Sequence, residues 1–158
     1  MDWYRAYKLT KTNMSTNCLF CKIVAGEIPA TKIYEDEKSL AFLDIMPASY
    51  GHTLVIPKEH HANFDEVTPE VLCQTISCAQ KVGRAVKSAL DLEGYNVDIH
   101  NGEVAGQSVQ HLHIHIIPRH KDDGLLLFPR SKYQDGEMEE IAGKIREQVK
   151  RQKAKVKI

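Results

Sequence analysis

The segment 111–118 reads His111-Leu112-His113-Ile114-His115-Ile116-Ile117-Pro118. Imidazole and aliphatic side chains alternate along its first six residues. Successive side chains of a β-strand point to opposite faces, so this alternation predicts a strand over 112–118 with an aliphatic face in the core. The three histidines then share the other face, where a ligand can meet them together.

The loop before this strand is polar and carries two glycines, Gly102 and Gly106. Glycine lets backbone N–H groups approach an anion closely, and Gln107 and Ser108 add neutral hydrogen-bonding groups. No acidic residue lies between Gly106 and His115 to repel a phosphate. The loop therefore has the character of a phosphate cradle.

Two kinds of chemistry fit three histidines on one strand face. The histidines can bind a metal, with three ligands and an open position as in a catalytic zinc site. Alternatively, one imidazole attacks phosphorus while its neighbours donate to the phosphate, since an ordinary imidazole with a pKa of about 6.5 is mostly neutral at pH 7. The phosphate cradle favours the second chemistry.

Hydrophobic periodicity predicts the remaining elements. The clearest is a helix that Thr68 caps, that begins at Pro69 and that ends near Leu92, before Gly94. This order of elements predicts an α+β fold: an antiparallel sheet of about five strands with the helices against one face, one long helix after the third strand and a C-terminal helix. The other expected elements are a helical turn over 19–25, strands over 32–34, 39–43, 53–57 and 95–100, and a last helix from about Asp135.

The composition suits a soluble globular chain of 158 residues, 42% of them hydrophobic and 27% charged. The formal net charge is zero, which argues against a dedicated nucleic-acid binder or a membrane-surface binder. No segment approaches the roughly 18 consecutive apolar residues of a membrane span. We expect a disordered leader over 1–17, a folded domain over 18–130, and a C-terminal helix with a basic tail over 131–158.

The two ends of the chain and its four cysteines bear on location. Without a secretory signal, we expect a reducing compartment, most simply the cytoplasm. The leader carries three basic residues and one acidic residue, so a mitochondrial address is the alternative. The seven basic residues between Lys144 and Ile158 are interpreted as a solvated helix end rather than a nucleic-acid contact.

A longer pattern surrounds the histidines. It reads Asn101-Gly102, then Ala105-Gly106-Gln107-Ser108-Val109-Gln110-His111-Leu112-His113-Ile114-His115-Ile116-Ile117-Pro118-Arg119, and further motifs lie upstream at 19–23, 27–30, 41–45 and 51–60. Together they resemble the histidine-triad (HIT) family over roughly 18–129. An ordered set of this kind is far more specific than any one motif.

The resemblance implies roles for the histidines. His113 would attack the α-phosphorus of a nucleotide and form a nucleotidyl-histidine intermediate, which water then hydrolyses. Its other ring nitrogen would be anchored on a backbone carbonyl near His111. His115 would donate to the phosphate with support from His52, and Ser108 would assist the leaving group. The remaining phosphate contacts that the family implies are Asn101, Gly106 and Gln107.

The resemblance also implies a nucleoside site. Asp44 matches the ribose-binding acid of the family, although a turn residue at a strand end is nearly as simple an interpretation. The apolar slot for the base would consist of Phe20, Ile23, Ile28, Phe42 and Ile45. Without the family, these five would be read as core residues, and an apolar slot does not specify the base, although the family acts mostly on purine nucleotides.

A separate metal site is indicated near the N-terminus. Cys18 and Cys21 form a Cys-x-x-Cys pair, which alone indicates a zinc knuckle, a redox pair or chance. Part of the family holds zinc with such a pair, and the resemblance implies that His60 and His111 complete the set, with His61 as an adjacent competitor. Two thiolates and two imidazoles make a closed tetrahedral site, hence a structural one.

The function that the resemblance implies is hydrolysis of nucleoside phosphoramidates or related nucleotide conjugates by a homodimer, with no organic cofactor. Two alternatives stay open: a dinucleoside polyphosphate hydrolase, and a nucleotide-binding scaffold with little turnover. A metal-dependent hydrolase would instead place all three histidines on one catalytic metal and leave Cys18, Cys21 and His60 without a role.

Overall fold

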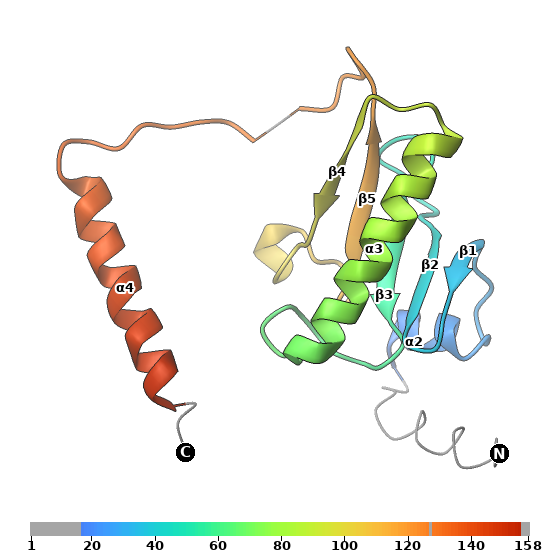
Figure 1. Ribbon diagram of the computed structural model, residues 1–158, viewed down its shortest axis with the longest axis horizontal. Helices are drawn as coiled ribbons and strands as arrows, with labels where there is room; N and C mark the ends of the chain where they lie inside the picture. The colour runs from blue at the N-terminus through green and yellow to red at the C-terminus, as the bar shows by residue number, and fades with distance from the viewer. Residues whose placement is uncertain (1–16, 127, 156–158) are drawn as a thin grey trace. The chain divides into compact units, whose positions relative to one another are not determined.

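The computed structural model describes residues 17–126 and 128–155 (Figure 1). Residues 1–16 of the predicted leader and the last residues of the basic tail lie outside the described residues. No helix within the described ranges is both long and apolar enough to cross a membrane. The elements are α2 (Leu19–Val24), β1 (Lys32–Glu35), β2 (Ser39–Leu43), β3 (Thr53–Pro57), α3 (Pro69–Ala89), β4 (Gly94–Asp98), the 3₁₀ turn η1 (Glu103–Ala105), β5 (Ile114–Arg119) and α4 (Glu137–Lys155).

The described strands form one antiparallel five-stranded sheet in the order β1-β2-β3-β5-β4. β5 therefore lies between β3 and β4, with His115 opposite Leu54 on one side and Asp98 on the other. The predicted α+β class, the five-stranded antiparallel sheet, the long helix after the third strand and the C-terminal helix are confirmed.

The long helix α3 packs along one face of the sheet (Figure 1). The Thr68 hydroxyl accepts a hydrogen bond from the Val71 N–H, so the helix begins as the sequence predicts. It ends at Ala89, three residues before the predicted end, because Asp91 takes a left-handed conformation with φ of 50° that turns the chain. The cluster between helix and sheet consists of Ala41, Val55, Cys78, Ala79, Val82, Val86, Leu92, Ile114 and Ile116.

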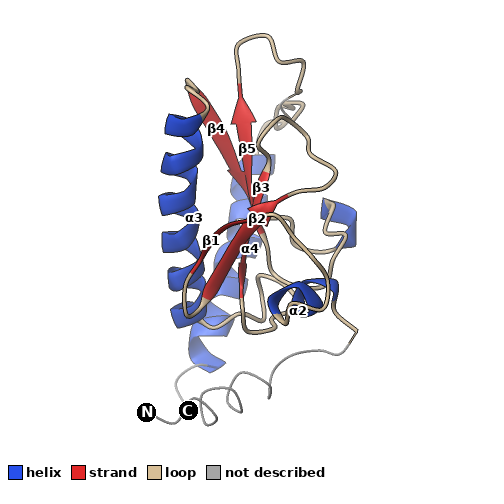
Figure 2. Ribbon diagram, turned by 90° about the vertical axis from the view of Figure 1, so that its right-hand side faces the viewer, coloured by secondary structure: helices blue, strands red, loops and turns tan. Residues whose placement is uncertain are grey.

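The short helix α2 lies on the opposite face of the sheet from α3 (Figure 2). The prediction that the helices share one face is therefore wrong. β2 and β3 are buried on both faces, so each supplies apolar side chains to two layers. The second cluster, beneath α2, consists of Cys18, Phe20, Cys21, Ile23, Leu40, Phe42, Leu54 and Ile56.

β5 begins at Ile114, two residues later than predicted. The Leu112 N–H donates to the His61 carbonyl and the His111 N–H to the Val109 carbonyl, so the chain here bonds to loops rather than to a neighbouring strand. The alternation of side chains nevertheless continues, since Leu112, Ile114 and Ile116 are all buried. The first two histidines of the run therefore precede the strand, and only His115 lies within it.

α4 belongs to a second compact unit, which begins at Gly124. Its first turn carries Glu137, Glu139 and Glu140, which favour the positive end of the helix dipole. Ion pairs along the helix, such as Lys144 with Glu140 and Arg151 with Glu147, join residues four apart. Its apolar stripe of Ile141, Ile145 and Val149 is partly exposed.

Candidate active site

His113 is a buried imidazole with only 3% of its surface exposed. Its Nδ1 lies 2.7 Å from the His111 carbonyl oxygen, the kind of contact that the resemblance implies. Because a carbonyl only accepts, Nδ1 carries the proton and Nε2 keeps its lone pair. Burial lowers the pKa of His113 below its ordinary value of 6.5, although the bond to the carbonyl opposes this shift. His113 is therefore a neutral imidazole with a free nucleophilic nitrogen.

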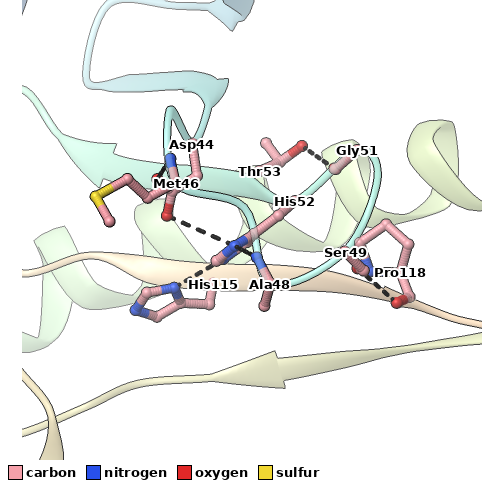
Figure 3. Close-up of polar contacts among 9 residues, drawn as sticks. All are labelled: Asp44, Met46, Ala48, Ser49, Gly51, His52, Thr53, His115 and Pro118. Atoms are coloured by element: carbon pink, nitrogen blue, oxygen red, sulfur yellow. Dashed lines mark hydrogen bonds and ion pairs between the residues drawn. The ribbon is translucent and has the colours of Figure 1, made fainter. Parts of the chain in front are cut away.

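His115 is held by a chain of hydrogen bonds that runs through His52 (Figure 3). The Ala48 N–H donates to His52 Nδ1 over 3.1 Å, so the proton of a neutral His52 lies on Nε2. That nitrogen lies 2.9 Å from His115 Nδ1 and donates to it, which leaves the proton of His115 on Nε2. Among the described residues, no partner binds this Nε2.

The protonation states agree with this chain. Burial lowers the pKa of His115 to about 3 and also lowers the pKa of His52, although Asp44 opposes the shift at His52. Both imidazoles are therefore neutral near pH 7. The site pairs a lone pair on His113 with an N–H donor on His115, and the two ring centroids lie 4.9 Å apart.

Asp44 lies beside this chain (Figure 3). Its Oδ2 is 3.5 Å from His52 Nδ1, and its Oδ1 accepts the Met46 N–H over 2.8 Å. The carboxylate thus stabilises the turn after β2, which agrees with the interpretation of Asp44 as a turn residue. It also remains partly exposed, so its remaining lone pairs are open to a ligand.

The glycine-bearing loop is held by its own side chains. Gln107 is 2% exposed; its Oε1 accepts the Gly102 N–H, and its Nε2 donates to the Ala62 and Val109 carbonyls. Because these bonds occupy its amide, a contact between this side chain and phosphate would require one of them to break. Asn101 is also engaged, since it accepts from the Phe64 N–H and donates to Asp65.

The predicted nucleotide-binding residues fall into two groups by exposure. Phe20, Ile23 and Phe42 are buried in the cluster beneath α2, and the rings of Phe20 and His113 meet in an edge-to-face arrangement at a centroid distance of 5.3 Å. Ile28 is half-buried against the same cluster, whereas Ile45 is 93% exposed. The first three thus act as core residues. Exposed residues of the predicted site that are open to a ligand include Ile45, Gly106 and Ser108.

The four predicted metal ligands converge on one point. Their ligand atoms all lie within 4.8 Å of one another, a spacing that admits one tetrahedral ion. Cys18 Sγ lies 3.4 Å from His111 Nδ1, and Cys21 Sγ lies 3.4 Å from His60 Nδ1. His111 Nε2 donates to the Pro57 carbonyl, so Nδ1 presents a lone pair to the thiols. His61 does not join the cluster.

One residue beside the site was not predicted. His100 lies with its ring centroid 4.6 Å from that of His115. The expected strand over 95–100 could have carried this signal, but β4 ends at Asp98, opposite His115, and His100 lies two residues beyond it in the loop.

The antiparallel sheet thus brings a neutral imidazole with a free lone pair beside an imidazole donor, an arrangement suited to nucleophilic attack on an electrophilic centre such as phosphorus. A model of the HIT domain matches residues 25–122 of the chain. The chain belongs to the HIT family.

Individual relatives support the same assignment. The chain is 47% identical over 107 residues to adenosine 5′-monophosphoramidase hnt1 of Schizosaccharomyces pombe. The aligned residues cover 68% of this chain and 77% of that protein. A crystal structure from Streptococcus mutans UA159 aligns with a TM-score of 0.83 at 41% identity, over 88% of this chain and 89% of that one. A zinc-bound histidine triad family protein from Mycobacterium smegmatis aligns with a TM-score of 0.67 at 40% identity, over 73% and 84% of the two chains.

Proposed function

We propose that the protein hydrolyses a nucleoside 5′-phosphoramidate, or a related nucleotide conjugate, through a nucleotidyl intermediate on His113. One observation carries the proposal: His113 Nδ1 is anchored on the His111 carbonyl, which leaves Nε2 as a free nucleophile beside the unpartnered Nε2–H of His115. The adenosine 5′-monophosphoramidase among the relatives supports the substrate class.

The reaction divides into two displacements at phosphorus. First, His113 Nε2 bonds to the α-phosphorus, the P–N bond to the leaving amine breaks, and the amine nitrogen gains a proton. We assign Ser108, which is exposed at the end of the phosphate cradle, as the donor of this proton. A water then attacks phosphorus and its proton passes to Ser108, which restores the hydroxyl, while the bond between phosphorus and His113 Nε2 breaks and the nucleoside monophosphate leaves.

His115 stabilises the charge that develops in both displacements. Its Nε2–H donates to a phosphate oxygen, and His52 fixes the proton on that nitrogen. Asp44 would accept hydrogen bonds from the ribose hydroxyls through its remaining lone pairs. Ile28 and Ile45 are the members of the predicted base slot that are partly or fully exposed, so we assign them to the contact with the base. We assign Asn101, Gly106 and Gln107 to the wall of the phosphate site rather than to the reacting atoms.

We also propose a structural zinc ion held by Cys18, Cys21, His60 and His111. The convergence of four soft or borderline ligands supports it, as does the zinc-bound relative from Mycobacterium smegmatis. When bound, zinc supplies a closed tetrahedral cross-link and no Lewis-acid chemistry. The residues it would join include His111, whose carbonyl anchors His113. The catalytic imidazoles themselves remain outside this cluster.

Finally, we propose a cytoplasmic homodimer. β4 is an edge strand of the sheet, and Val97 on it is 50% exposed, while Ile76 on α3 is 42% exposed. An open edge with apolar side chains is a template for pairing with another chain. The molecular mass in solution, measured by light scattering, tests this assembly, and a monomer at micromolar concentration would reject it.

The decisive experiment measures hydrolysis of adenosine 5′-phosphoramidate by the wild-type protein and by His113→Ala. We expect turnover by the wild type and a loss of at least ~10³ in kcat for the variant, because only binding and the phosphate site remain. His120→Ala, a change of an exposed histidine outside the site, is the matched control.

The other outcomes separate the alternatives. An inactive wild type that binds adenosine monophosphate would favour a nucleotide-binding scaffold. A wild type that cleaves only dinucleoside polyphosphates would favour that class of hydrolase. Equal activity of the wild type and His113→Ala would reject His113 as nucleophile and leave a metal-dependent hydrolase as the alternative.

A further inference from the structure

We infer that His100 is a positioning residue that packs against the ring of His115 and aims its Nε2–H at the phosphate. This inference rests on the proposed function. The two ring centroids lie 4.6 Å apart with an interplanar angle of 32°, a tilted stack in direct contact. No hydrogen bond joins the His100 ring to another described residue, so the contact is one of packing.

The fold brings His100 to this position by strand register. Asp98, the last residue of β4, pairs with His115 on β5, and His100 lies two residues beyond it, where the glycine-bearing loop begins. His100 thus reaches His115 from the end of the edge strand β4, whereas His52, just before β3, reaches it from the other side of β5.

The glycine loop leaves the space for the His100 ring. Gly106 adopts φ of +94°, a conformation that favours glycine, and a Cβ there would lie 3.2 Å from His100 Nδ1. The His100 ring thus contacts the ring of His115 and lies close to Gly106, where a larger residue would crowd it.

The hydrogen bond from His52 does not by itself fix the orientation of the His115 ring. It fixes Nδ1, and with it the tautomer, but the ring still tilts about that contact and carries Nε2 away from its target. The rings of His52 and His113 also contact His115, at centroid distances of 5.1 and 4.9 Å, and the ring of His100 adds the shortest of these contacts, which limits the tilt further. Because a donor stabilises a developing charge only when it is aimed correctly, His100 affects the rate without touching the reacting atoms.

The test compares three substitutions at one position with His120→Ala as the matched control. His100→Phe keeps a flat ring without polar atoms, His100→Asn keeps hydrogen-bonding groups without the ring, and His100→Ala removes both. The readouts are kcat and KM for adenosine 5′-phosphoramidate, the affinity for adenosine monophosphate, and the melting temperature.

We expect His100→Ala and His100→Asn to lower kcat about tenfold, a fraction of the 10²–10³ that loss of a whole donor produces. We expect kcat of His100→Phe to stay within about threefold of the wild type, with the melting temperature nearly unchanged in all three variants. Rescue by phenylalanine is a result that a polar contact with substrate would not give.

Two results would overturn the inference. One is an unchanged kcat in His100→Ala; the other is a His100→Phe variant as slow as His100→Ala while His100→Asn stays active. If the wild type itself shows no turnover, the proposed function fails on its own. In that case the affinity for adenosine monophosphate tests the role of His100. Binding about tenfold weaker in His100→Ala, with recovery in His100→Phe, would support positioning of the donor, and equal affinities in all variants would reject it.

Discussion

At the scale of single residues, the proton positions decide what each histidine does. His113 and His115 have the same side chain and lie two residues apart, yet one presents a lone pair and the other an N–H. The difference comes from their partners: His113 Nδ1 faces a carbonyl, which only accepts, while His115 Nδ1 faces the donor nitrogen of His52. A strand pattern places imidazoles together but does not assign their protons.

Substitution of His52 tests the assignment at His115. In His52→Ala, His115 loses the partner that fixes its proton on Nε2, so both tautomers are populated and fewer molecules present the donor. We expect kcat for adenosine 5′-phosphoramidate to fall about ten- to a hundredfold, the usual range for loss of such an orienting partner. His52→Gln, whose amide nitrogen can donate to His115 Nδ1, should recover part of the loss. Equal kcat in His52→Ala and the wild type would disprove the assignment.

Sequence reasoning at this scale succeeded where the resemblance to the family specifies a set of residues. The resemblance implies that Cys18, Cys21, His60 and His111 act together, and these four side chains converge, whereas the Cys-x-x-Cys pair alone left several interpretations open. It was less informative for amides: Gln107 has a hydrogen-bonding group for a phosphate, but its side chain is occupied by the loop. A side-chain amide can hydrogen-bond to the backbone or to a ligand equally well, so the sequence alone does not show which of the two it binds.

At the scale of elements, the boundaries depend on where the backbone finds hydrogen bonds. The bounds of β2 and β3 agree with the prediction, since both strands are short, apolar and flanked by turn residues. β5 starts late because the N–H groups of His111 and Leu112 bond to loop carbonyls. α2 lies opposite α3 because β2 and β3 are apolar on both faces, and a run without alternation does not reveal which layer covers which face.

The turn before β3 gives a prediction about stability. Gly51 has φ of +86°, and a Cβ there would lie 2.5 Å from Leu90 Cδ1 at the end of α3. Gly51→Ala therefore combines backbone strain with a clash, and we expect the free energy of unfolding to fall by about 2–4 kcal/mol in urea titrations. Gly26→Ala is the matched control, because Gly26 also has positive φ but its Cβ would meet nothing within 4 Å. Equal losses in the two variants would contradict a close approach of Leu90.

At the scale of the whole molecule, the cysteine and histidine cluster joins parts of the chain that are far apart in sequence. Cys18 and Cys21 begin α2, His60 follows β3, and His111 precedes β5. A cross-link between such distant segments restricts the unfolded chain more than a local one does. The proposed cross-link would also hold His111, whose carbonyl anchors His113, so it would support both stability and catalysis. The family motifs predicted this support, whereas the pairing of two chains and the location in the cell depend on surfaces and signals that the motifs do not describe.

Loss of one thiol should therefore affect metal content, stability and activity together. We expect the wild type to carry one zinc per chain by elemental analysis, and Cys18→Ser to lose it. Breaking the cross-link should lower stability by at least about 2 kcal/mol, and the melting temperature by roughly 4–8 °C. kcat should fall as well, because the His111 carbonyl then holds His113 less firmly. Cys73→Ser is the matched control, since Cys73 is exposed on α3 and outside the cluster. A wild type without zinc, or a Cys18→Ser variant as stable and active as Cys73→Ser, would show that the cluster is held by packing alone.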